Sequence, residues 1–188
     1  MKLRIIHLLC VFSLAWGSVF TKHKIDEEPL LAQPLTVRWR YESNVTLNLT
    51  PAFDNERIYL PLAGGTIVAL KAHDGQLLWR SDLGGELSAS PVADASAIYV
   101  ASETTTPNGE PRAQSGALRA LGREGGVTRW VTALGKPLRG ALTISDTKIF
   151  AGGSEGRAYA FDKRTGGLFW SIPFTSPFNT QPVLKDGR

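Results

Sequence analysis

The residue types that most often carry catalysis are sparse in this chain of 188 residues, which has three histidines and one cysteine. A zinc site or a proton relay needs several such side chains converging on one point. His7 and Cys10 lie in an apolar N-terminal stretch, His23 follows that stretch, and His73 lies in the turn-like segment HDG. Their spacing indicates no histidine relay, no metal site and no cysteine nucleophile, so we predict no catalytic residue.

Carboxylates could serve as general bases or calcium ligands. In this chain, however, most of them stand in short segments rich in glycine, serine and threonine, which are typical of turns. A carboxylate in a turn usually accepts hydrogen bonds from nearby backbone N–H groups. We therefore expect turn capping or exposed charge for Asp74, Glu86, Asp94, Asp146 and Asp162.

The N-terminus has the layout of a secretory signal peptide. Lys2 and Arg4 precede an apolar run over residues 5–12, which is short against the roughly 20 residues that a membrane-spanning helix needs. Small residues at both ends of the Ala-Trp-Gly triplet 15–17 match a cleavage site. We predict a signal peptide over residues 1–17 and an exported protein, periplasmic or in the outer envelope.

Residues 18–34 show no strand pattern and are expected to form a linker. Lipoprotein anchoring is not supported, because Leu8 and Leu9 precede Cys10 where a small residue would be needed. Any membrane association is therefore expected to be indirect. Loss of Lys2 and Arg4 with the signal lowers the formal net charge from +4 to +2. The remaining basic residues are scattered, which excludes a basic patch for nucleic acid.

The elements that would position any site are revealed by the tryptophans. Beyond the signal these are Trp39, Trp79, Trp130 and Trp170, separated by 40, 51 and 40 residues. The longer middle gap contains the polar segment 103–115, rich in Pro, Gly and Thr, which we interpret as an inserted surface loop. A period of about 40 residues is typical of β-propeller blades.

Three of the tryptophans have an alanine ten residues before them and a glycine four residues before them. The glycines stand in turn sequences, where they can supply the positive φ of a tight hairpin. The alanine leaves room for the indole. The matched triplets are Ala69, Gly75 and Trp79; Ala120, Gly126 and Trp130; and Ala160, Gly166 and Trp170.

Each unit is expected to contain four short strands, because β-branched and aromatic residues alternate with small or polar ones between turn residues. Trp39 is expected in the last strand of an incomplete first unit. The predicted strands cover residues 47–53, 57–62, 66–71, 76–83, 87–93, 97–102, 116–121, 127–134, 139–144, 148–152, 157–161, 167–172 and 180–184.

The pattern A-x5-G-x3-W, best seen in ALKAHDGQLLW and AFDKRTGGLFW, resembles the tryptophan-docking motif of the PQQ-type β-propeller repeat family. The resemblance implies that each tryptophan clasps neighbouring blades together. The acidic residue that the family usually has two positions after the alanine is present only as Asp162, with Lys71 and Gly122 at the matching places. The resemblance therefore predicts an all-β fold, a partial β-propeller over residues 35–188.

About three complete four-stranded blades are expected, with partial blades at each end. Propellers usually close with four to eight blades, so we expect the chain to be a fragment of a longer protein. The family includes quinoprotein dehydrogenases and BamB-like exported propellers, among them a lipoprotein that assists outer-membrane β-barrel assembly.

The favoured function is a non-enzymatic scaffold in the bacterial cell envelope, which binds proteins or peptides through blade loops and needs no cofactor; the resemblance implies a role of the outer-membrane-assembly type. The alternative is the N-terminal fragment of a PQQ-dependent quinoprotein dehydrogenase, which would use PQQ and calcium.

Overall fold

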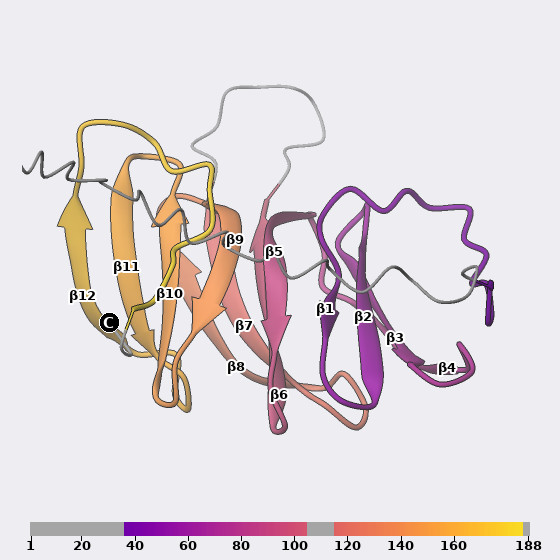
Figure 1. Ribbon diagram of the computed structural model, residues 1–188. Coiled ribbons are helices and arrows are strands. Elements are labelled where there is room, and N and C mark those ends of the chain that lie inside the picture. The colour runs from indigo at the N-terminus through magenta and orange to yellow at the C-terminus, as the bar shows by residue number, and fades with distance from the viewer. Residues whose placement is uncertain (1–35, 105–114, 186–188) are drawn as a thin grey trace, which may run out of the picture. The chain divides into compact units, whose positions relative to one another are not determined.

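The computed structural model describes residues 36–104 and 115–185, which contain twelve β-strands and no helix (Figure 1). The predicted signal peptide 1–17, the linker 18–34 and most of the loop 103–115 lie outside the described residues and stay predictions. No helix able to span a membrane is found in the part of the chain that the structure describes.

The strands form three antiparallel blades of four, each with its strands in chain order. The first blade contains β1 (Ala52–Phe53), β2 (Arg57–Leu62), β3 (Thr66–Lys71) and β4 (Leu77–Asp82). The second contains β5 (Glu86–Ala93), β6 (Ala97–Glu103), β7 (Gly116–Gly122) and β8 (Thr128–Leu134). The third contains β9 (Leu138–Ile144), β10 (Lys148–Gly153), β11 (Arg157–Asp162) and β12 (Leu168–Pro173).

The first strands of successive blades lie side by side. A parallel bridge between Ser90 of β5 and Ala141 of β9 joins the second and third blades into one sheet of eight strands. In the first blade, the backbone N–H of Thr50 donates to the Ser90 hydroxyl at 3.1 Å. Thr50, Ser90 and Ala141 repeat at the same 40- and 51-residue spacing as the tryptophans, as expected for blades set around an axis.

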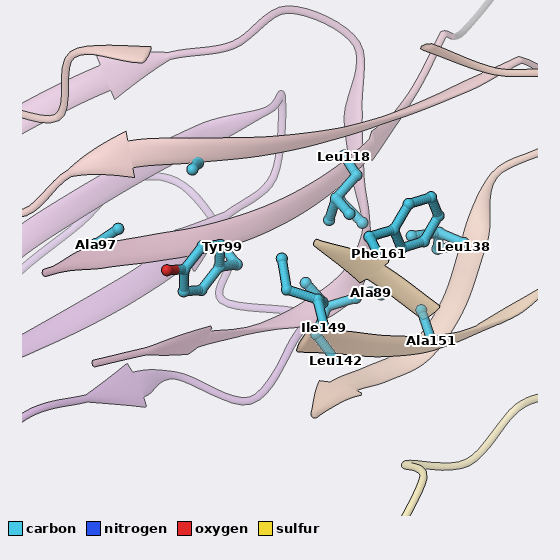
Figure 2. Close-up of a cluster of buried hydrophobic side chains, with 11 residues drawn as sticks. Ala89, Ala97, Tyr99, Leu118, Leu138, Leu142, Ile149, Ala151 and Phe161 are labelled. Carbon is cyan, nitrogen blue, oxygen red and sulfur yellow. The ribbon is translucent and has the colours of Figure 1, made fainter. Parts of the chain in front are cut away.

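The core lies between blades, because successive residues of a strand point to opposite faces of its sheet. On one face of the second blade, Ile98, Val100 and Leu121 pack against the first blade, with Tyr59 and Ile67 among their neighbours. The opposite face packs against the third blade (Figure 2).

In the cluster between the second and third blades, Leu118 of β7 lies close to Leu138 and Phe161 of the third blade (Figure 2). Tyr99 and Ile149 continue this contact along the seam, as we call the interface between two neighbouring blades. All five side chains are at most 2% exposed. Full burial of an apolar side chain of this size contributes about 1.5–3 kcal/mol. The faces of neighbouring blades therefore stabilise one another.

The predicted all-β partial propeller is confirmed, and eleven of the thirteen predicted strand ranges agree with the structure to within one residue at each end. The first strand is shorter than the predicted 47–53, because the N–H of Thr50 is taken by Ser90 of the next blade. Leu47 forms only an isolated bridge to Leu62.

The predictions that two segments form strands of partial blades are wrong. Residues 180–184 form no ladder, although they lie beside β9: the Thr143 hydroxyl donates to the Pro182 carbonyl at 2.6 Å, and the Gln181 amide donates to the Leu142 carbonyl at 3.4 Å. Pro182 has no N–H to donate to a ladder. The stretch around Trp39 also has no strand partner within the described residues.

Candidate functional site

Each alanine of the repeated triplets is the direct cross-strand neighbour of its tryptophan. The register pairs Ala69 with Trp79, Ala120 with Trp130, and Ala160 with Trp170. The three alanines are at most 1% exposed. A methyl group at this position leaves the space beside the indole that a larger side chain would fill.

Each glycine of the triplets lies in the turn between the third and fourth strands. The φ angles of Gly75, Gly126 and Gly166 are 75°, 67° and 75°, in the left-handed region that favours glycine. The N–H of each glycine donates to the carbonyl four residues earlier, at 2.8–2.9 Å. The turn therefore fixes a backbone conformation that other residue types adopt only with strain.

The same glycines contact a tryptophan of the preceding repeat. A Cβ added at Gly75 would lie 2.6 Å from Cε3 of Trp39, and one at Gly126 would lie 2.5 Å from Cε3 of Trp79. A Cβ at Gly166 would lie 2.5 Å from Cε3 of Trp130. Each indole thus rests directly on the glycine turn of the next blade.

From the sequence we expected these glycines only to form turns, and the packing role was missed. The signal was available in the spacing: Trp39 precedes Gly75 by 36 residues and Trp130 precedes Gly166 by 36 residues. The corresponding distance from Trp79 to Gly126 is longer by the length of the insertion in the second blade.

Hydrogen bonds add to the first two of these contacts. The indole N–H of Trp39 donates to the Ala72 carbonyl at 3.0 Å, and that of Trp79 donates to the Arg123 carbonyl at 2.8 Å. Within its own blade, each triplet tryptophan also contacts an aromatic ring of the second strand, at centroid distances of 5.8–6.2 Å. The pairs are Tyr59 with Trp79, Tyr99 with Trp130, and Phe150 with Trp170.

An ion pair crosses the seam between the first and second blades. Arg123 Nε lies 2.7 Å from Asp54 Oδ2, and the Tyr59 hydroxyl donates to the same oxygen at 2.9 Å. Burial alone would raise the pKa of Asp54, but hydrogen bonds from Arg123, Tyr59 and two backbone N–H groups hold it well below its usual range. Burial, reinforced by the Asp54 carboxylate, raises the pKa of Tyr59 to about 12.

The matching pair in the next seam joins Asp94 to Lys163 at 3.0 Å. Burial opposes ionisation here as well, but hydrogen bonds from Ser96, Lys163 and the backbone N–H of Ala97 lower the pKa of Asp94 to about 2. The sequence did not reveal these pairs, although Asp54 and Asp94 share the repeat spacing and each precedes an Ile-Tyr strand.

Hydrogen bonds place Asp74 and Asp162 in turns, as expected. Asp74 Oδ1 accepts from the N–H of Gln76, and Asp162 Oδ1 accepts from the N–H groups of Arg164 and Thr165. Glu86 does not lie in a turn itself, because it is the first residue of β5, but its carboxylate accepts from the N–H of Gly64 in the turn between β2 and β3.

Chemistry-bearing side chains do not gather elsewhere in the described part of the chain. His73 lies on the surface, where its Nε2 is 3.0 Å from an Arg38 guanidinium nitrogen. No group of three or more His, Cys, Asp or Glu side chains that could hold a metal ion is found among residues 36–104 and 115–185. His7, Cys10 and His23 lie outside those residues.

A groove of about 430 Å³ runs along the first strands of the three blades. Thr50, Ser90, Thr143 and Gln181 are its polar side chains, and apolar residues such as Phe53 supply the rest. No charged side chain lines it within the described residues. The groove can offer hydroxyl and amide hydrogen bonds and apolar contacts, but no general base.

Comparison with known proteins gives a family match across the blades. A family model described as "Outer membrane protein assembly factor BamB" matches residues 32–108 and 114–188. The outer membrane protein assembly factor BamB of Shewanella oneidensis is 26% identical over 126 residues, which are 64% of this chain and 29% of that protein. The chain therefore spans about a third or less of the length of this curated relative.

Solved structures show the same fold. BamB from Moraxella catarrhalis is similar with a TM-score of 0.59 and 20% identity, over 72% of this chain and 39% of that one. The quinohemoprotein alcohol dehydrogenase ADHIIG from Pseudomonas putida HK5 is similar with a TM-score of 0.58 and 17% identity, over 73% of this chain and 22% of that one. At these identities the likeness concerns the fold alone.

Proposed function

The chain belongs to the BamB family of outer membrane protein assembly factors, and we propose that it forms part of a non-enzymatic scaffold that supports outer membrane assembly. The observation that carries this proposal is the family match, which covers all three blades. The fold is shared with enzymes, so it does not by itself select the function.

The geometry of the blades supports a binding role. Tryptophan-on-glycine contacts and partly buried ion pairs connect neighbouring blades, while the turns between strands remain at the surface. Turns held on such a framework can dock a protein or peptide with little loss of conformational freedom. We propose that partners are proteins that bind through these turns and the loop 103–115.

The proposed location is the bacterial cell envelope, on the periplasmic side of the outer membrane. The expected signal peptide 1–17 supports export, and the curated relative is an outer membrane protein assembly factor. Association with the membrane would be indirect, through a protein partner.

A second candidate is a PQQ-dependent dehydrogenase, because the fold is also similar to that of a quinohemoprotein alcohol dehydrogenase. PQQ carries several carboxylates and the associated calcium ion needs oxygen ligands, commonly carboxylates. The groove along the first strands presents no cation and no carboxylate among the described residues, so these residues do not fit the cofactor and its metal.

Deletion of the complete gene from its source bacterium tests the proposal. We expect a lower amount of folded outer-membrane β-barrel proteins, measured as the heat-modifiable fraction on gels, and recovery when the full-length gene is returned. Unchanged barrel levels in the deletion strain would overturn the proposed role.

The dehydrogenase is tested on the purified full-length protein supplied with PQQ and calcium. We expect no dye-linked oxidation of alcohols or sugars and no bound quinone in the absorption spectrum. Turnover that depends on both PQQ and calcium would show that the protein is a dehydrogenase and would overturn the proposed scaffold.

A further inference from the structure

The two seams between complete blades differ at matching positions. In the seam between the first and second blades, the Arg57 guanidinium binds the Glu124 carboxylate with two hydrogen bonds, at 2.9 and 2.6 Å. Arg123 binds Glu56 at 2.8 Å in the same seam. These side chains fill the space beside Trp79, whose indole N–H is already bonded to the Arg123 carbonyl.

The seam between the second and third blades lacks these pairs. One repeat further along the chain, Ala97 stands in place of Arg57, Ser96 in place of Glu56, and Arg164 in place of Glu124. A cavity of about 450 Å³ opens there, and its lining includes Tyr99 and Trp130. The loss of two long side chains from the second blade leaves this space empty.

Several hydrogen-bond donors that line this cavity have no acceptor among the described side chains. The Trp130 ring still rests on Gly166, but no hydrogen bond from its indole N–H is found within the described residues. Arg129 and Arg164 also line the cavity, and neither forms an ion pair within residues 36–104 and 115–185. Lys163, by contrast, is neutralised by Asp94 at 3.0 Å.

The acidic residues of the lining form no ion pair with Arg129 or Arg164 within the described residues. Asp162 accepts three hydrogen bonds from its own turn, two from backbone N–H groups and one from the Thr165 hydroxyl. Asp146 lines the cavity without an ion pair to any cation of the described residues. Its charge disfavours a ligand as strongly anionic as a phosphate, while a single carboxylate remains compatible with two guanidinium groups.

We propose that this seam binds the carboxylate of an aspartate or glutamate side chain in an acidic-apolar segment of a protein partner. The carboxylate occupies the space that the Arg57 and Glu56 side chains fill in the first seam, and it pairs with Arg164 and Arg129. Arginine suits this role because its planar fork binds carboxylates with two hydrogen bonds. An apolar neighbour in the segment packs on Trp130 and Tyr99, and the free indole N–H donates to the peptide.

The test uses the full-length protein carrying 5-fluorotryptophan, with the Trp130 resonance assigned through Trp130→Phe. The probes are two capped tripeptides, acetyl-Leu-Glu-Leu-amide and acetyl-Leu-Gln-Leu-amide. We expect the glutamate peptide to shift the Trp130 resonance in a saturable titration, and the glutamine peptide to bind at least about tenfold more weakly. Equal binding of both peptides, no binding, or shifts confined to other tryptophans would overturn the site.

A variant with the ion pair of the first seam provides the structural check. Ala97→Arg combined with Arg164→Glu is expected to fill the cavity and abolish the response of Trp130. Arg80→Ala, at an exposed position of β4 in the first blade, is expected to leave the response unchanged. Arg164→Gln nearly keeps the size of the side chain and removes its charge, so it is expected to weaken binding of the glutamate peptide. It tests the site independently if the double variant does not fold. Wild-type affinity in Arg164→Gln would contradict the proposal.

These outcomes are separate from the proposed function. Peptide binding is measured on the purified protein and needs no assembly partner. Failure of the peptide test would overturn the proposed seam site only, and the scaffold role would still be decided by the barrel-assembly experiment.

Discussion

The glycine of each repeated triplet meets two requirements at one residue. At Gly126 the φ angle is 67°, which costs about 1–2 kcal/mol for a residue with a Cβ. The Trp79 ring packs against this glycine, and a Cβ at position 126 would lie only 2.5 Å from Cε3 of that ring. The backbone and the packing therefore select glycine independently.

Gly126→Ala is expected to lower the free energy of unfolding by about 3 kcal/mol, from backbone strain together with the clash against the Trp79 ring. The matched control is Gly84→Ala, because Gly84 has a φ of 73° and nothing within 4 Å of an added Cβ. It should cost about 1 kcal/mol. Urea titration of both variants checks this. Equal losses would show that the contact with Trp79 contributes nothing.

Asp94 gives the seam between the second and third blades a predictable response to acid. Its pKa in the folded protein is about 2, below the ordinary 3.8, so the folded state binds fewer protons than the unfolded state at intermediate pH. The stabilisation is fully present above about pH 4 and is lost as the pH falls through about 2.

Between pH 5 and pH 2, wild type is expected to lose about 2 kcal/mol more unfolding free energy than Asp94→Asn, which keeps a turn-capping side chain but has no proton to bind. Denaturant unfolding across this pH range measures the difference. Parallel pH profiles for the two proteins would exclude a stabilising role for the ionised carboxylate.

At the scale of elements, the contacts that connect the blades are the least local in sequence. The turn glycines, the alanine opposite each indole and the strand ends all follow from short patterns, which is why the strand ranges were predictable. Asp54 and Arg123, however, belong to different blades, and no short pattern joins them. The donors of Arg129, Trp130 and Arg164 that line the second seam were likewise not predictable from a short pattern, because they are recognised only when matching positions of the two seams are compared.

Segments at the margins of the repeat show where pattern alone misleads. Residues 180–184 stand where the repeat predicts a first strand, yet hydrogen bonding there runs through the Thr143 and Gln181 side chains, not through a backbone ladder. A strand needs a neighbour that offers backbone groups in register, and a place in the repeat does not supply one. The groove along the first strands could not be foreseen either, because three blades contribute to it.

The ion pair between Asp54 and Arg123 is expected to couple the first two blades energetically. Their side chains are only 7% and 17% exposed. A double-mutant cycle with Asp54→Ala and Arg123→Ala should give a coupling energy of about 1–2 kcal/mol. The control pair, Arg80 and Asp82, lies within one strand with both side chains more than half exposed, and should show no measurable coupling. Equal coupling in both pairs would contradict this account of the seam.

At the scale of the molecule, the described blades combine firm seams with a groove that has no charged side chains. Every blade contributes turns to the surface, and the mutual burial of blade faces holds those turns in place. Such an arrangement is compatible with the scaffold proposed above. The family to which the chain belongs carries the name of an assembly factor, in agreement with this arrangement.

The most direct test of the scaffold is the level of folded outer-membrane β-barrel proteins in cells that lack the gene and also cannot make PQQ. The full-length gene, returned on a plasmid, is expected to restore the heat-modifiable barrel fraction completely without added PQQ. No restoration, or restoration only when PQQ is supplied, would show that the protein does not act by binding alone.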